Sequence, residues 1–165
     1  MNRLVVTIFG VMFAVSAFAE EIPIQGNVES KCVIITDTTG VYGNPTPSNL
    51  STDATDGGVT PIVRYDVSQG EYYKALISYP TSFSQSPSLT DTVAFDGGVV
   101  VDRVSTTAMS DYDTEKVEFN NTTEYGLTEA GSTWFAISSE VDYGFSKAFP
   151  GGTYRALITA ECIAQ

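Results

Sequence analysis

The sequence predicts an all-β domain, and three observations lead to that prediction. Thr, Val, Tyr and Phe are abundant and gather in short runs of about four to eight residues. Gly, Asn, Asp, Ser and Pro separate these runs at intervals of about 8–12 residues. No window has the 3.6-residue apolar period of a helix, so the crossover helices of a parallel α/β fold are lacking. We expect an immunoglobulin-like antiparallel β-sandwich, with a closed barrel as the alternative.

Residues 1–19 have the pattern of a secretory signal peptide. Arg3 precedes an apolar run that extends to Val15, and Ala17-Phe18-Ala19 matches the small-residue cleavage pattern. A membrane anchor is the alternative, but the apolar run is short and no stop-transfer charges follow it. We therefore expect an exported chain that is not inserted in a membrane.

Residues 20–30 form a strand-like arm ahead of the main domain, which we place at residues 31–165. Ile22, Ile24, Gly26 and Val28 have the same parity, so they share one face of an extended chain. This apolar face must be buried, either in the chain's own domain or in another molecule.

The first half of the domain is expected to contain strands at 31–35, 59–67 and 72–79, with one short strand near Tyr42. A turn is expected at 53–58. Pro61 restricts its run to a sheet edge or to the start of a strand. Residues 68–71 would join the 59–67 and 72–79 strands as a hairpin.

In the second half, Asp96-Gly97-Gly98 is expected to form a tight turn between strands at 92–95 and 99–104. Further strands are expected at 115–119, 132–138 and 140–145, with at most one helical turn around 125–130. The longest alternating segment, residues 153–163, follows a turn at Pro150-Gly151-Gly152.

The two cysteines, Cys32 and Cys162, are expected to form a disulfide that ties the first strand to the last. An exported chain favours this pairing. The chain has no histidine and no Cys-x-x-Cys spacing, which argues against the alternatives, a metal site or a free reactive thiol.

The composition argues against several functions. Eight Lys and Arg against twenty Asp and Glu give a net charge of −12, which repels nucleic acid and anionic membranes. Without histidine there is no Ser-His-Asp or Cys-His arrangement, and no phosphate-binding glycine motif is present. We expect a protein that is not an enzyme and needs no cofactor.

Two acidic segments leave a calcium ion open as a weaker alternative to plain surface solubilisation. They contribute Asp53 and Asp56 in one loop, and Asp111, Asp113 and Glu115 in another. Trp134, the only tryptophan, lies in an apolar run, so we expect it in the core rather than in a sugar-stacking position.

Several features, taken in order, resemble one family. They are the signal, the alternating arm, Cys32 at the opening of a strand, Tyr42-Gly43, the all-β body and the closing Gly151–Tyr154 segment. This order resembles bacterial pilin-like subunits of the chaperone–usher type, in particular the archaic class and the related spore coat protein U-like domains. Two features depart from that pattern: the chain ends Ile163-Ala-Gln165 without a penultimate tyrosine, and the second cysteine lies in the last strand.

The resemblance implies an incomplete sandwich that is completed by a donor strand from a neighbouring subunit. Ile22, Ile24 and Val28 would fill pockets of the groove, and Gly26 would lie where the groove is tightest. The chain would then be a structural subunit of a surface fibre, or fimbrium. Its partners would be copies of itself or related subunits, a periplasmic chaperone and an outer-membrane usher. The alternative function is a self-contained secreted β-sandwich that binds carbohydrate or a surface.

Overall fold

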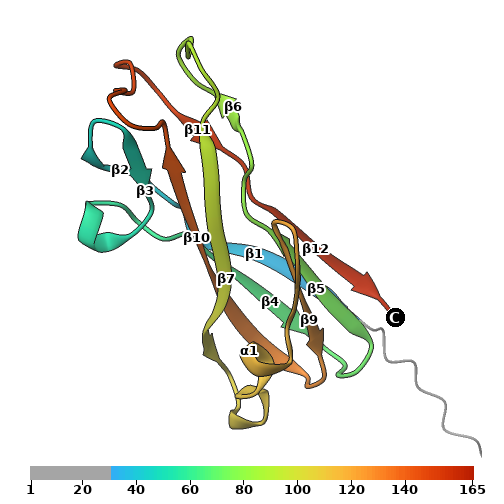
Figure 1. The fold of residues 1–165 in the computed structure, drawn as a ribbon. Helices are drawn as coiled ribbons and strands as arrows, with labels where there is room; N and C mark the ends of the chain where they lie inside the picture. The colour runs from blue at the N-terminus through green and yellow to red at the C-terminus, as the bar shows by residue number, and fades with distance from the viewer. Residues whose placement is uncertain (1–30) are drawn as a thin grey trace, which may run out of the picture.

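The computed structural model describes residues 31–165, which fold into antiparallel strands with little helix (Figure 1). The strands are β1 (Cys32–Thr38), β2 (Gly43–Thr46), β3 (Asn49–Ser51), β4 (Ile62–Val67), β5 (Tyr73–Ser78), β6 (Phe83–Gln85), β7 (Ala94–Val104), β8 (Val117–Phe119), β9 (Thr122–Leu127), β10 (Gly131–Asp142), β11 (Arg155–Ala156) and β12 (Thr159–Ala164). The helical turns are η1 (Ala54–Asp56), η2 (Thr107–Met109) and α1 (Tyr112–Glu115).

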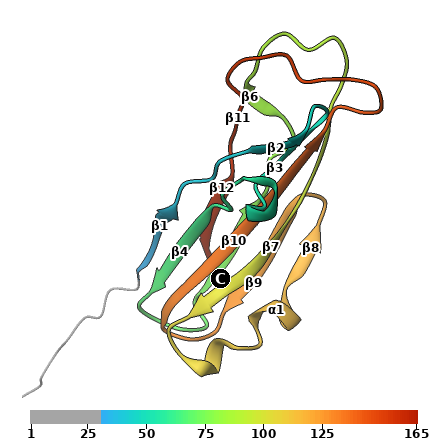
Figure 2. The ribbon, with the colours of Figure 1, turned by 90° about the vertical axis from the view of Figure 1, so that its left-hand side faces the viewer.

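The strands form two facing sheets and a small ribbon. One sheet has the order β1-β4-β10-β3-β2, with β7 on the other side of β10. The second sheet has the order β12-β5-β9-β8, and β11 pairs with β6 alone. Figures 1 and 2 show the two sheets packed face to face. The predicted all-β, immunoglobulin-like antiparallel sandwich is therefore confirmed.

The core lies between the sheets and is built by strand alternation. Every second residue of β4, β5, β9 and β10 points inward, and most of these positions are apolar or aromatic, with Thr123, Thr133 and Ser139 as buried polar exceptions. Within one sheet the Tyr65 ring packs edge-on against Phe135, with the centroids 5.5 Å apart. Across the gap the Tyr125 ring packs against Phe135 at a tilt, with the centroids 4.5 Å apart. The buried residues of these four strands include Val63, Tyr65, Val67, Ala75, Ile77, Tyr125, Leu127, Phe135 and Ile137.

The sandwich has two ends that differ in content. The end that carries Lys31, the C-terminus and α1 is called the base end. The end that carries the β2–β3 turn and the β10–β11 connection (143–154) is called the loop end (Figure 1). Across residues 31–165 we find no helix long and apolar enough to cross a membrane.

The predicted hairpin between 59–67 and 72–79 is wrong. Strand β4 pairs with β1 and β10, whereas β5 pairs with β12 and β9, so the short connection passes from one sheet to the other. Gly70 permits this crossing, because a Cβ there would overlap the carbonyl oxygen of Thr128. Pro61 does precede β4, one of the two positions predicted for it.

The predicted turn at Asp96-Gly97-Gly98 is also wrong, because β7 runs unbroken through it. Gly97 pairs with Ser139 of β10 and lies so close to the neighbouring chain that a Cβ would overlap the carbonyl oxygen of Ser138. The glycine therefore serves a close approach inside a strand rather than a turn.

Two smaller predictions need correction as well. The expected helical turn at 125–130 is instead the end of β9, and the one α-helical turn of the described chain is α1. The 153–163 segment divides into β11 and β12, with Leu157 and Ile158 between them.

Candidate functional site

Two sheet edges on the same side of the sandwich are left without a partner strand. Strand β1 is the last strand of its sheet and β12 is the last strand of the other. Among the described residues, β1 pairs only with β4 and β12 pairs only with β5. Each edge therefore presents a row of backbone N–H and C=O groups that a further strand could bind.

The inward-facing residues of these two edges border a gap in the core. Ile34 of β1 lies opposite buried Tyr65, and Ala160 of β12 lies opposite buried Ile77, yet Ile34 and Ala160 are only half-buried. Between the edges lies a cavity of about 460 Å³. Its apolar lining includes Ile34, Val41, Pro61, Val63, Ile158 and Ala160. We call this cavity, with its continuation described below, the β1–β12 groove.

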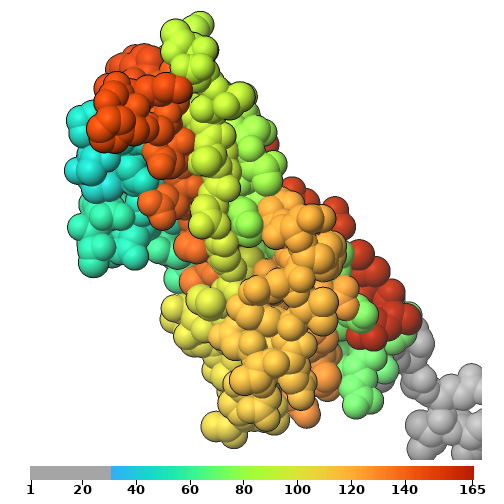
Figure 3. Space-filling model, viewed as in Figure 1, coloured from blue at the N-terminus to red at the C-terminus, as the bar shows by residue number. Residues whose placement is uncertain are grey.

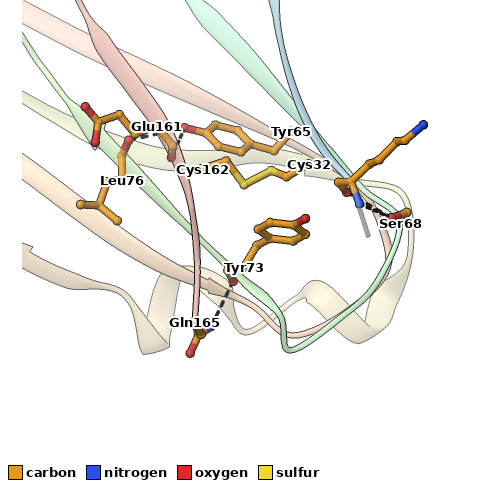
Figure 4. The surroundings of a disulfide bond; sticks show 9 residues. Cys32, Tyr65, Ser68, Tyr73, Leu76, Glu161, Cys162 and Gln165 are labelled. Atoms are coloured by element: carbon orange, nitrogen blue, oxygen red, sulfur yellow. Dashed lines mark hydrogen bonds between the residues drawn. A yellow bond between two sulfur atoms is a disulfide. The ribbon is translucent and has the colours of Figure 1, made fainter. Parts of the chain in front are cut away.

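The Cys32–Cys162 disulfide closes the base end of the β1–β12 groove (Figure 4). It confirms the predicted pairing and links residues 130 positions apart. The two Cα atoms are 6.4 Å apart. Two strands that hold a third between them are separated by about 9.5 Å, so no strand fits between β1 and β12 at this point.

Tyr65 ties the two sheets together next to the disulfide. Its side chain is fully buried, and its hydroxyl donates to the carbonyl oxygen of Glu161 on β12 at 3.1 Å (Figure 4). Burial raises the pKa of Tyr65 far above the ordinary tyrosine value, and the negative charge of Glu161 adds to the rise. This end of the groove is therefore cross-linked both covalently and by a buried hydrogen bond.

At the loop end the groove stays open. A second cavity of about 460 Å³ shares Gly40, Val41 and Tyr42 with the first and continues along Phe149 to Tyr154. At this end the ring of Phe83, in β6, packs against two other rings, with centroid distances of 5.1 Å to Tyr154 and 4.8 Å to Phe95. The groove thus leads from the loop end to the disulfide.

On the opposite side of the sandwich, side chains bind part of the outer edge of β7. The carboxylate of Asp113, in α1, accepts the backbone N–H of Val101 at 3.0 Å. The carbonyl oxygen of Val99 accepts from Lys116 Nζ at 3.0 Å and from the Tyr125 hydroxyl at 2.8 Å. These contacts occupy the outward backbone groups of Val99 and Val101, so a further strand could not bind β7 at these two residues.

The acidic segments considered for calcium do not converge. Asp53 caps η1 by accepting the N–H of Thr55, and Asp113 binds β7 as described. Within residues 31–165, no group of three or more Asp, Glu, Cys or His side chains is placed to hold a metal ion.

Trp134 is not a core residue, so that prediction is wrong. Its neighbours Thr133 and Phe135 point inward, and strand alternation turns Trp134 to the outer face of the β1-β4-β10 sheet. The guanidinium of Arg103 lies 4.4 Å from the ring centroid and that of Arg64 lies 5.8 Å away. The ring is thus stacked with arginine.

Part of this site was predictable from the sequence. Cys32 and Cys162 are paired as predicted, whereas Ile22, Ile24, Gly26 and Val28 lie outside the described residues. Ile34, Tyr42, Ile158 and Ala160 were not predicted as groove residues. Their apolar alternation gave a signal for strands, but only the pairing of the sheets shows that they border an open edge.

A comparison with family models, curated proteins and solved structures found no match for this chain.

Proposed function

We propose that the chain is a structural subunit of an extracellular fibre, and that the β1–β12 groove accepts the N-terminal arm (residues 20–30) of a neighbouring copy. The observation that carries the proposal is the pair of unpartnered strand edges that border one apolar groove. A strand placed there would pair with both edges and cover the half-exposed core, as in β-augmentation.

The chemistry of the arm suits the groove. Ile22, Ile24 and Val28 recur with even spacing, so in an extended strand they project to one side about 6.7 Å apart or at multiples of that distance. The groove offers apolar walls formed by residues such as Ile34, Val63 and Ile158. Gly26 would lie where the groove leaves no room for a side chain.

The disulfide sets the direction in which the arm lies. With the base end closed, a donor strand has to reach the groove through the loop end, and its N-terminal residues point toward Cys32 and Cys162. Strand β12 runs from the loop end to the base end, so the inserted arm is antiparallel to it (Figure 1). The body of the donor copy then lies beyond the loop end of the acceptor.

A neighbouring copy is a better source than the chain's own arm. Only residues 29–31 separate Val28 from Cys32. Lys31 is already held at the base end, where its N–H donates to Ser68 Oγ at 2.7 Å and its carbonyl oxygen accepts from Ser68 N at 3.0 Å. To fill its own groove, the arm would have to reverse within two residues and cross the disulfide.

The same proposal accounts for export and for helper proteins. The disulfide is compatible with an oxidising compartment, and a secreted subunit passes the periplasm on its way to the cell surface. An empty apolar groove between open edges favours aggregation, so a periplasmic chaperone would protect it until an outer-membrane usher allows assembly.

The first experiment removes the donor. The wild-type chain is expected to form polymers visible by electron microscopy, and the same chain lacking residues 20–28 is expected to remain monomeric. A matched pair refines it: Ile22→Ser with Ile24→Ser should shorten the polymers, whereas Gln25→Ser with Asn27→Ser, on the other face, should not. Polymers of wild-type length from the deleted chain would disprove insertion through this arm.

The second experiment blocks the acceptor. Ala160→Arg places a charge in the groove, and Thr159→Arg places it on the outer face of the same strand. We expect Ala160→Arg to stop polymerisation and Thr159→Arg to allow it, as measured by sedimentation of assembled material. Stable monomers of the wild-type chain in both experiments would instead favour the self-contained binding module.

A further inference from the structure

Phe145 is an aromatic side chain that the fold holds in solvent. It is 96 % exposed, whereas the other aromatic residues of the β10–β11 connection, Tyr143, Phe149 and Tyr154, pack against one another. Gly144 and Ser146 on either side have φ angles of 93° and 62°. A positive φ at Ser146 is unfavourable for an L-residue, so the local backbone accepts strain to turn Phe145 outward.

Contacts on both sides of Phe145 hold the backbone that carries it. The Tyr143 ring stacks on Phe149 at 5.1 Å, and its hydroxyl bonds to the N–H and Oγ1 of Thr90, both at 3.0 Å. Lys147 pairs with Asp91 at 2.8 Å. An aromatic ring presented on a rigid support loses little entropy on binding, as is typical of interface anchors.

Phe145 belongs to the β10–β11 connection, which also lines the open mouth of the β1–β12 groove through Phe149, Gly151 and Gly152. Figure 3 shows this connection, in orange-red, protruding at the loop end. If the proposed arm insertion is correct, Val28 lies in the groove and Lys31 of the donor follows within about 10 Å. The base end of the donor copy is therefore brought next to Phe145.

The base end carries a hollow that suits an aromatic ring. A cavity of about 290 Å³ is lined by Lys31, Val33, Asp66, Val67, Ser68, Gly131 and Ser132. Val33 is 46 % exposed there. Asp66 Oδ1 is buried without a hydrogen-bond partner among the described residues, and the Ser146 hydroxyl next to Phe145 can supply a donor.

We propose that Phe145 of the acceptor copy docks into this base hollow of the donor copy and forms a second contact between successive subunits. The proposal rests on the fibre function above. Because the inserted arm already tethers the two copies, the second contact forms at a high effective concentration and needs little affinity of its own. Its consequence is a fixed angle between neighbouring subunits.

A photo-cross-linking experiment tests the contact in the full-length chain. Phe145 is replaced by benzoylphenylalanine, and the matched control carries the same replacement at Phe119, an exposed aromatic on edge strand β8. We expect cross-linked dimers only from position 145, joined to peptides that contain residues 31–33, 66–68 or 131–132 of the second copy. Persistence length measured by electron microscopy should fall for Phe145→Ser and stay at the wild-type value for Phe119→Ser.

The outcomes separate this inference from the proposed function. Polymers whose cross-links from position 145 miss the base hollow overturn the second contact and leave arm insertion intact. If the wild-type chain forms no polymers and the variant with benzoylphenylalanine at position 145 forms no cross-linked dimers, both proposals are overturned.

Discussion

The fold raises the pKa of two buried tyrosine hydroxyls. Tyr65 and Tyr125 are almost fully buried, and their hydroxyls donate to backbone carbonyl oxygens of Glu161 and Val99. Burial raises the pKa of both well above the ordinary tyrosine value, and the negative charge of Asp113 adds to the effect at Tyr125. Both hydroxyls therefore stay protonated in the folded chain at pH values where the unfolded chain ionises.

This difference predicts alkaline instability. Below pH about 10 both states keep the proton, and the contribution of these tyrosines is fully present; above it the unfolded state ionises first and stability falls. Tyr125→Phe should lower the steepness of that fall by about 1.4 kcal/mol per pH unit, measured by urea unfolding between pH 9 and 11.5. Equal slopes for wild type and Tyr125→Phe would contradict the assignment.

Residue roles were predictable where chemistry alone decides them. The cysteine pairing was predicted because the sequence contains only two cysteines and no histidine, and the structure confirms it. The outward position of Trp134 agrees with strand alternation, since Phe135 and Ile137 on the other parity are buried, whereas its size and apolar character favour the core. The role of Asp113 was not predictable, because it depends on the packing of α1 against β7.

At the scale of elements, α1 binds the outer edge of β7 through the carboxylate of Asp113. Removing its carboxylate with Asp113→Ala leaves the Val101 N–H without its partner, and we expect a loss of about 1–3 kcal/mol in the free energy of unfolding. Asp111→Ala, two residues away and without a side-chain cap bond, should change it by less than about 0.5 kcal/mol. Similar losses for the two variants in urea unfolding would argue against an edge-capping role.

The neighbouring glycines of β7 offer a second test at this scale. A Cβ at Gly97 would overlap the Ser138 carbonyl oxygen and lie 2.9 Å from the Tyr79 ring, whereas a Cβ at Gly98 meets only Ser138 Oγ at 3.6 Å. Gly97→Ala should therefore cost about 1–3 kcal/mol, and Gly98→Ala should cost nothing or stabilise the strand slightly. Thermal unfolding of the two variants measures the contrast, and equal melting temperatures would rule out a special role for Gly97.

Elements were predicted better than their connections. Most strands lie where alternation and turn residues place them, because both signals are local. Whether Ser68 to Glu71 makes a hairpin or crosses between sheets depends on which partners β4 and β5 choose, and those partners, β1, β10, β12 and β9, come from distant parts of the chain. The glycine at position 97 predicted a turn, but it is needed because the chain packs closely against Ser138 of β10.

For the molecule as a whole, the disulfide joins the two sheets where no third strand connects them. It closes a loop of 130 residues, for which the chain-entropy relation gives about 5 kcal/mol at most. The double variant Cys32→Ser, Cys162→Ser should lose a large part of this, measured by urea unfolding of oxidised protein against the variant. A change below about 1 kcal/mol would show that the unfolded chain gains no freedom from the loss.

The overall sandwich was predictable because composition, strand length and turn spacing agree on it. The groove was not, since it is a property of which edges remain unpaired once β1 and β12 end their sheets on the same side. The arm that would fill it was visible in the sequence only as an apolar face in need of cover.

A groove that is sealed at one end gives the assembly a polarity. Every copy would carry its N-terminal arm at the base end and a groove that opens at the loop end. All copies in a fibre would therefore point the same way, and one unfilled groove would remain at one tip. The opposite tip would carry an arm that is not inserted. A peptide spanning residues 20–30 should then stop elongation once it matches the number of unfilled grooves, on free subunits and fibre ends together.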